Sequence, residues 1–194
     1  MQNNHAHLIL SRNNLKLVAL TNEHRNALAE IALEKEIWKY APHPYDQPEI
    51  FEEKWLDKAF AQMQKNERQC FTIFADNKVI GSSSFYEIDL KNKKTNLGYT
   101  WFHPSVWGSK MNALSKLILL EYAFETLELN RVGFSIDSLN ERSCHAVKKI
   151  GIKYEGTLRN DLILHNGRVR DSVIFSVIRN EWPDVKKVIE TIVG

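Results

Sequence analysis

The chain has little of what several protein classes require, beginning with cysteine. Its 194 residues include two cysteines, Cys70 and Cys144, with no Cys-x-x-Cys spacing. This excludes a disulfide scaffold and a cysteine-based zinc site. We therefore expect a protein of a reducing compartment and predict a cytoplasmic location.

Excess charge of one sign and long apolar runs are also missing. The formal net charge is +2, with basic and acidic residues interspersed, so no basic face is expected to attract nucleic acid or an anionic membrane. No run of about 18 uncharged apolar residues is present to span a bilayer. The seven histidines show no metal-ligand spacing such as His-Glu-x-x-His. We expect no nucleic acid, membrane or metal partner.

The chain also lacks internal repeats, low-complexity tracts and Pro/Gly/Ser linkers, so we predict a single domain over residues 1–194, with 1–13 mobile. Hydrophobic spacing predicts an alternation of strands and helices. Strands are expected at 15–20, 70–75, 79–88, 95–102, 131–138, 152–164 and 168–178. Helices are expected after residue 21 and over 48–66, 112–127, 141–150 and 181–193. This order predicts a mixed α/β sheet layered by helices.

One junction carries a chemical signal: WFHPSVWGSKMN reads as a strand end, a Gly-containing turn and a helix start. A helix N-terminus leaves backbone N–H groups unpaired and carries a partial positive charge, so it can bind a phosphate. The alternative is that Gly108 only turns the chain and Asn112 only caps the helix.

Four stretches resemble one enzyme family: LGYTWFHPSVWGSKMN, LLEYAFETLELNRVGFSIDSLNERSCHAVKKIGIKYEGTLR, NGRVRDSVIFSVI and NEWPDVK. The family is the GNAT superfamily of acyl-CoA-dependent N-acetyltransferases, specifically its branch of ribosomal-protein N-terminal (RimJ/RimL-like) acetyltransferases. The resemblance implies a GNAT-like α/β (α+β) fold: a mixed, largely antiparallel seven-stranded sheet with helices on both faces and a splayed central strand pair. It implies acetyl-CoA as co-substrate and no metal.

In this family a Q/R-x-x-G-x-G/A loop cradles the coenzyme pyrophosphate, and here Lys110 occupies its central glycine position. Lys110 either adds a cation for the phosphates or strains the turn through its Cβ; we favour retained binding. The residues that the resemblance assigns to coenzyme binding are Phe102, Trp107, Gly108, Ser109, Lys110, Met111, Asn112, Asn140 and Ser143.

The resemblance also assigns a proton donor. Many GNAT enzymes use a tyrosine whose position is Val147 here, so we carry the role to Ser143, used by the N-terminal acetyltransferase branch. The alternative is an ordinary serine in the first turn of a helix. Asn140 either caps this helix or binds the pantetheine arm, or does both.

The general base is left open. A glutamate expected from the resemblance falls on Leu162, and adjacent Asp161 should point to the other face of the strand. Asp171 in the facing strand is the other candidate. Each is alternatively a solvated or salt-bridged carboxylate, and an α-amine with a pKa of about 8 could react without a dedicated base.

The aromatic loop over residues 38–48 lies where family members build part of the acceptor pocket, so Trp38, Tyr40 and Tyr45 are predicted to bind the acceptor; the alternative is packing over the sheet. We expect direct acetyl transfer to a primary amine, a protein N-terminal α-amine or else a small amine such as a polyamine or antibiotic. The alternative that is not an enzyme is a non-catalytic acyl-CoA-binding module. The chain is expected to be a monomer or a homodimer.

Overall fold

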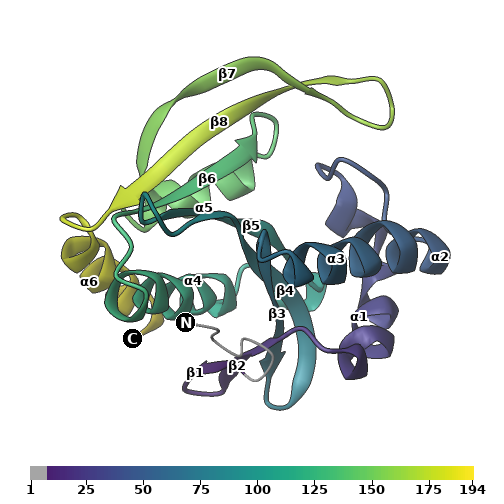
Figure 1. The fold of residues 1–194 in the computed structure, drawn as a ribbon, viewed down its shortest axis with the longest axis horizontal. Helices are drawn as coiled ribbons and strands as arrows, with labels where there is room; N and C mark the ends of the chain where they lie inside the picture. Colours follow the sequence, from purple (N-terminus) through teal and green to yellow (C-terminus); the bar gives the residue numbers. More distant parts are fainter. Residues whose placement is uncertain (1–7) are drawn as a thin grey trace.

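The structure, a computed structural model, describes residues 8–194, and within this range eight strands form one sheet in the order β1-β2-β3-β4-β5-β6-β8-β7 (Figure 1). Neighbouring strands are antiparallel except β5 and β6, which are parallel. The strands are β1 (Ile9–Arg12), β2 (Leu15–Ala19), β3 (Arg68–Ala75), β4 (Lys78–Asp89), β5 (Lys94–Phe102), β6 (Arg131–Asp137), β7 (Lys153–Ile163) and β8 (Val169–Ile178).

Helices lie on both faces of the sheet, as expected. They are α1 (Arg25–Ala32), α2 (Pro48–Ile50), α3 (Lys58–Gln64), α4 (Met111–Glu121), α5 (Glu141–Lys149) and α6 (Trp182–Val193). A π-helical segment, Phe51–Asp57, joins α2 to α3, and a second, Tyr122–Thr126, continues α4. The helices predicted over 48–66 and 112–127 are therefore present, each with a π-helical segment.

Alternation along the strands supplies two hydrophobic cores. On β3, Phe71 and Ile73 pack in the core shared with α4, α5 and α6, whereas Cys70 packs in a second core with α1, α3 and the loop after α1. Because successive side chains of a strand point to opposite faces, one strand serves both cores.

The sheet has eight strands rather than the expected seven because residues 9–12 form β1. Ile9 pairs with Val18 and Arg12 with Leu15 across a turn in which Asn13 has a positive φ of 55°. Leu8 and Leu10 pack against the main core, which explains why this segment is ordered. Part of the segment expected to be mobile, residues 1–13, therefore forms a strand at 9–12, and residues 1–7 lie outside the described range.

The central strand pair is splayed, as predicted. The parallel strands β5 and β6 are in register only from Lys94–Arg131 to Asn96–Gly133. Further along β5, the register with β4 shifts between Ser82 and Ser84, and Tyr99 adopts a φ of +50°. Such a bulge bends a strand and increases its twist, so β5 leaves β6 and a crevice opens between them.

Candidate functional site

A cavity of about 740 Å³ occupies the crevice between β5 and β6. Side chains from both faces of the sheet line it, so the crevice is open rather than sealed by packing. Its walls include Trp38, Tyr40, Tyr45, Tyr86, Leu97, Tyr99, Trp101, Asn112, Lys116, Phe134, Ser135, Asn140, Ser143, Val147, Leu158, Asp161, Leu162 and Arg170.

The turn before α4 and the first residues of α4 present unpaired backbone donors. Within the described residues, the N–H groups of Gly108, Lys110, Asn112 and Ala113 have no hydrogen-bond acceptor. The N–H of Met111 donates to the Ser109 hydroxyl at 3.3 Å. The turn can therefore accept an anion through the main chain alone.

Lys110 does not strain this turn. Its φ is −73°, an ordinary helical value, and the positive φ of 76° falls on Gly108. The Lys110 ammonium lies 3.4 Å from the Val193 carbonyl oxygen at the end of α6. Of the two alternatives for Lys110, strain is excluded, and its side chain is directed toward α6.

Phe102 and Trp107, which are also predicted to hold the coenzyme, lie before this turn. The Trp107 indole N–H donates to the Phe102 carbonyl at 2.9 Å, and the Arg142 guanidinium stacks 3.8 Å from the Trp107 ring. Phe102 itself is buried in the main core. In the stretch from Phe102 to Asn112, only Asn112 lines the cavity.

Lys116 is a buried cation in the cavity that sequence reasoning missed. It is 8% exposed, and its ammonium donates to the Asn112 side-chain oxygen. Burial lowers the pKa of Lys116 from 10.5 to about 8. The sequence did contain a sign of this burial, because Lys116 lies among the apolar residues of α4, one residue before Leu117.

The start of α5 brings two predicted residues to the cavity. The Asn140 side-chain oxygen accepts a hydrogen bond from the Ser143 N–H at 3.1 Å, so Asn140 caps α5. Both residues line the cavity, and the Ser143 hydroxyl has no hydrogen-bond partner within residues 8–194. Val147, one turn later, lines the same wall.

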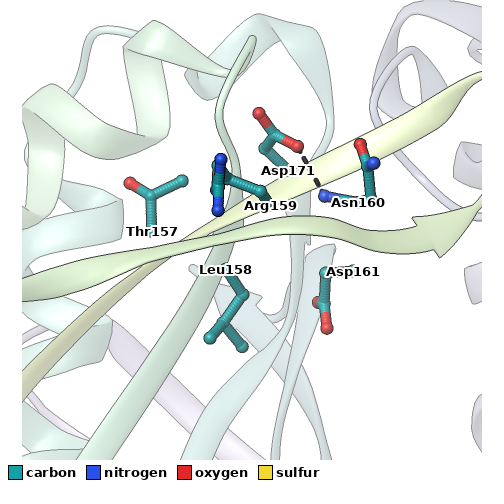
Figure 2. A pocket seen from close by; sticks show the side chains of 6 residues that line it. All are labelled: Thr157, Leu158, Arg159, Asn160, Asp161 and Asp171. Atoms are coloured by element: carbon teal, nitrogen blue, oxygen red, sulfur yellow. Dashed lines mark hydrogen bonds between the residues drawn. The ribbon is translucent and has the colours of Figure 1, made fainter.

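The two candidate aspartates lie on opposite sides of the β7–β8 hairpin (Figure 2). Leu158 pairs with Ser172 and Leu162 with Arg170. Three residues of β7, 159–161, therefore lie opposite a single residue of β8, Asp171. Asn160, at φ +53°, donates its N–H to the Asp171 carboxylate at 2.7 Å. The irregularity turns Asp161 to the side of Leu158, and both line the cavity.

Asp161 and Leu162 therefore both reach the cavity, although regular alternation would separate them. Asp171 does not line the cavity; it holds the bulge and borders a second, more open hollow on the hairpin. Arg170, beside it in sequence, does line the cavity and is 8% exposed. No residue pattern singled out Arg170 before the structure.

The predicted acceptor residues both pack and line the cavity. The Trp38 indole N–H donates to the Ala32 carbonyl at 2.7 Å, and its ring lies 5.1 Å from those of Tyr45 and Trp101. Burial raises the pKa of Tyr45 to about 12. Tyr40 is half-buried on the same wall. Packing over the sheet and a place in the wall of the cavity are thus compatible for this loop.

Within residues 8–194, no three His, Cys, Asp or Glu side chains gather as a metal site. In the same range, no helix has the length and apolar character needed to cross a membrane.

Known proteins resemble the chain in sequence. Residues 14–153 match the family described as acetyltransferase (GNAT) domain. The chain is 34% identical over 111 residues to the putative ribosomal N-acetyltransferase YdaF of Bacillus subtilis (strain 168), covering 57% of this chain and 60% of that protein. It is 21% identical over 112 residues to the spermidine N(1)-acetyltransferase of Escherichia coli (strain K12), covering 58% and 59%. The matched part thus spans about three fifths of these relatives.

Solved structures share the fold. A crystal structure of a putative acetyltransferase superposes with a TM-score of 0.86 at 29% identity, covering 94% of this chain and 92% of that one. RimL, a ribosomal L7/L12 alpha-N-protein acetyltransferase in complex with coenzyme A, superposes with a TM-score of 0.78 at 22% identity, covering 88% and 98%.

Proposed function

Because the chain belongs to the GNAT acetyltransferase family, we propose that it transfers an acetyl group directly from acetyl-CoA to a primary amine, the N-terminal α-amine of a protein. The observation that carries the proposal is the open cavity that joins the first turn of α4 to Ser143 and Asp161. A protein acceptor is supported by the similarity to YdaF, a putative ribosomal N-acetyltransferase, and to RimL, which acetylates a ribosomal protein.

The donor half binds acetyl-CoA through the main chain. The free N–H groups from Gly108 to Ala113 hold the pyrophosphate at the positive end of α4. The pantetheine arm then enters the crevice beside Asn112 and Asn140 and carries the thioester toward Ser143. Holding two reactants in this way removes up to about 7–11 kcal/mol of a bimolecular barrier, so no covalent intermediate on the protein is required.

Two side chains move protons. The Ser143 hydroxyl donates its proton to the departing thiolate and takes one back from water. Because the reference pKa of the thiol is only about 8.5, little assistance from an acid is needed. Val147 has no acidic group to compete for that role. Asp161 accepts, directly or through water, the proton that the acceptor ammonium loses to become the neutral amine that attacks the thioester. Asp171, bonded to the Asn160 N–H, is not assigned a catalytic role.

The proposal is tested by measuring thiol release from acetyl-CoA with a panel of peptides and a panel of small amines that includes spermidine. Turnover on peptides with free N-termini, together with a mass increase of about one acetyl group, is the expected result. Turnover restricted to small amines would favour a second candidate function, acetylation of a small amine. The similarity to a spermidine acetyltransferase supports this candidate.

Tight acetyl-CoA binding without turnover on either panel would instead identify a non-catalytic acyl-CoA-binding module. Lys110, Val147 and Leu162 are the departures from the family pattern that make this outcome worth testing.

A further inference from the structure

Arg170 is a buried cation without a partner among residues 8–194. Its side chain lines the cavity at 8% exposure, and its Nε is buried with no hydrogen-bond acceptor in the described range. By contrast, the guanidinium of Arg168, two residues earlier, is bonded to the Asp137 carboxylate. Burying a charged group without a partner is unfavourable, so the position of Arg170 favours an anion that arrives with a ligand.

Arg170 belongs to the acceptor side of the cavity. On β8, Val173, Phe175 and Val177 face the core shared with α4–α6. Because strand residues alternate, Arg170 faces the opposite side, toward the loop that carries Tyr40 and Tyr45. The unpaired N–H groups of α4 lie at the other face, so the anion expected at Arg170 is not the coenzyme pyrophosphate.

A carboxylate of opposite charge lies near Arg170 without contacting it. Asp161, next to the register partner of Arg170, lines the same cavity, and no ion pair joins the two. These charges act on the buried Tyr86 hydroxyl: burial raises the pKa of Tyr86, Glu87 and then Asp161 reinforce that rise, and Arg170 opposes it. The acceptor side therefore offers one cation, Arg170, and two carboxylates, Glu87 and Asp161, around a neutral phenol.

We propose that Arg170 binds a carboxylate of the acceptor, so that the protein selects a primary amine with a carboxylate a few bonds away. A peptide with Asp or Glu in its first two residues carries these groups, and so does a free α-amino acid. The planar guanidinium can bind such a carboxylate through two parallel N–H groups. Asp161 then accepts the proton of the amine. This inference rests on the proposed acetyl transfer and names its acceptor class.

The test compares matched acceptors on the full-length chain. Peptides with Asp or Glu at the second position are paired with Asn or Gln counterparts, and free aspartate and glutamate form a separate arm. For the wild type, kcat/KM should favour the acidic peptide by about 10- to 100-fold, as expected for one charge-assisted contact. The change should reside mainly in KM, because Arg170 binds and does not transfer protons.

Arg170→Gln should remove this preference, Arg170→Lys should keep part of it, and Arg159→Gln is the matched control. Arg159 belongs to the same hairpin but lies on the side of β7 away from Asp161 (Figure 2), so its substitution should preserve the preference. Acetyl-CoA affinity measured by calorimetry on each variant reports whether the donor half is intact.

Three results separate this inference from the proposed function. Equal kcat/KM for acidic and neutral acceptors would overturn the role of Arg170 while leaving acetyl transfer standing. Preference for the free amino acids over every peptide would keep Arg170 in its role and assign a small-molecule acceptor. If no acceptor turns over, calorimetric titration of the same peptides into the protein with bound CoA decides: preference for acidic peptides that Arg170→Gln abolishes supports the site, and no preference overturns it.

Discussion

The two ends of the cavity are built in different ways. At the first turn of α4 the binding groups are main-chain N–H groups, and their positions follow from the existence of the helix. At the β7–β8 hairpin the binding groups are charged side chains, and their directions depend on a local break in strand pairing. Under the proposed function, the comparison teaches that the donor end should tolerate changes of sequence, whereas the acceptor end should be sensitive to single residues.

The difference appears directly in how the two ends respond to an unusual residue. Lys110 stands where the resemblance places a family glycine, and its backbone keeps an ordinary helical φ of −73°. In the proposed function, binding at this turn depends on the main chain and not on this side chain. At the hairpin, by contrast, the charges that line the cavity are single side chains, the unpaired guanidinium of Arg170 and the carboxylate of Asp161.

The largest expected effect is on the chemical step that joins both ends. Ser143→Ala should lower kcat by about 100-fold or more, in the range expected for loss of a general acid, with acetyl-CoA affinity nearly unchanged. Thiol-release kinetics with the best acceptor measure it. Ser135→Ala, which removes another hydroxyl from the cavity wall, is the control and should change kcat little. Unchanged turnover in Ser143→Ala would remove Ser143 from the mechanism.

Lys116 tests how much the burial of a charged side chain in the cavity costs in stability. Because burial lowers its pKa from 10.5 to about 8, the unfolded chain binds more protons between these values, and stability should rise as pH increases from about 8 to 10.5. The shift corresponds to about 3 kcal/mol. Lys116→Met should therefore stabilise the protein at pH 7 by up to that amount and lose this advantage by pH 10.

Urea unfolding at pH 7 and pH 10 measures the Lys116 effect. Lys149→Met, at an exposed position of α5, is the control and should show no such pH dependence. If Lys116→Met is destabilised at both pH values, the ammonium contributes more through Asn112 than its burial costs.

The two aspartates of the hairpin should separate function from folding. Asp161→Asn should lower kcat/KM by about tenfold with little loss of stability, because its carboxylate lines the cavity and makes no structural hydrogen bond within residues 8–194. Asp171→Asn should instead cost about 1 kcal/mol of stability, since it weakens the acceptor of the Asn160 N–H. Kinetics and thermal unfolding on both variants check this, and the reverse pattern would exchange their roles.

The smallest effect is expected at Lys110, which occupies a position where the family pattern has glycine. Lys110→Gly should change acetyl-CoA affinity by less than about threefold, because the Lys110 ammonium is directed to the Val193 carbonyl and its backbone is unstrained. Calorimetric titration with acetyl-CoA measures it. Tight binding by the glycine variant alone, with none by the wild type, would show that Lys110 blocks the turn.

Sequence patterns predicted most of the fold because they report local periodicity. The helices on both faces and the splayed β5–β6 pair are confirmed. Strand β1, which the sequence did not predict, has four residues. Leu8 and Leu10 are the apolar residues of this segment that pack on the main core, so the hydrophobic pattern was too short to predict a strand. Its pairing depends on β2, which lies across a turn.

The site was predicted less completely, and for a physical reason. The turn before α4 and the start of α5 are local features, so Asn112, Asn140 and Ser143 could be named and all three line the cavity. The direction of Asp161 depends on how many residues of β7 oppose Asp171, which is a property of two strands together. Lys116 and Arg170 become notable only once their burial is known.

The irregular pairing of β7 with β8 also bears on how such a protein can diversify. Three consecutive side chains, Arg159, Asn160 and Asp161, share one position opposite Asp171. Gain or loss of a single residue there would rotate a different member of the trio inward, because strand side chains alternate with a period of two. The hairpin could thus exchange a carboxylate for an amide or a guanidinium by a one-codon insertion or deletion, while the sheet behind it is inherited unchanged.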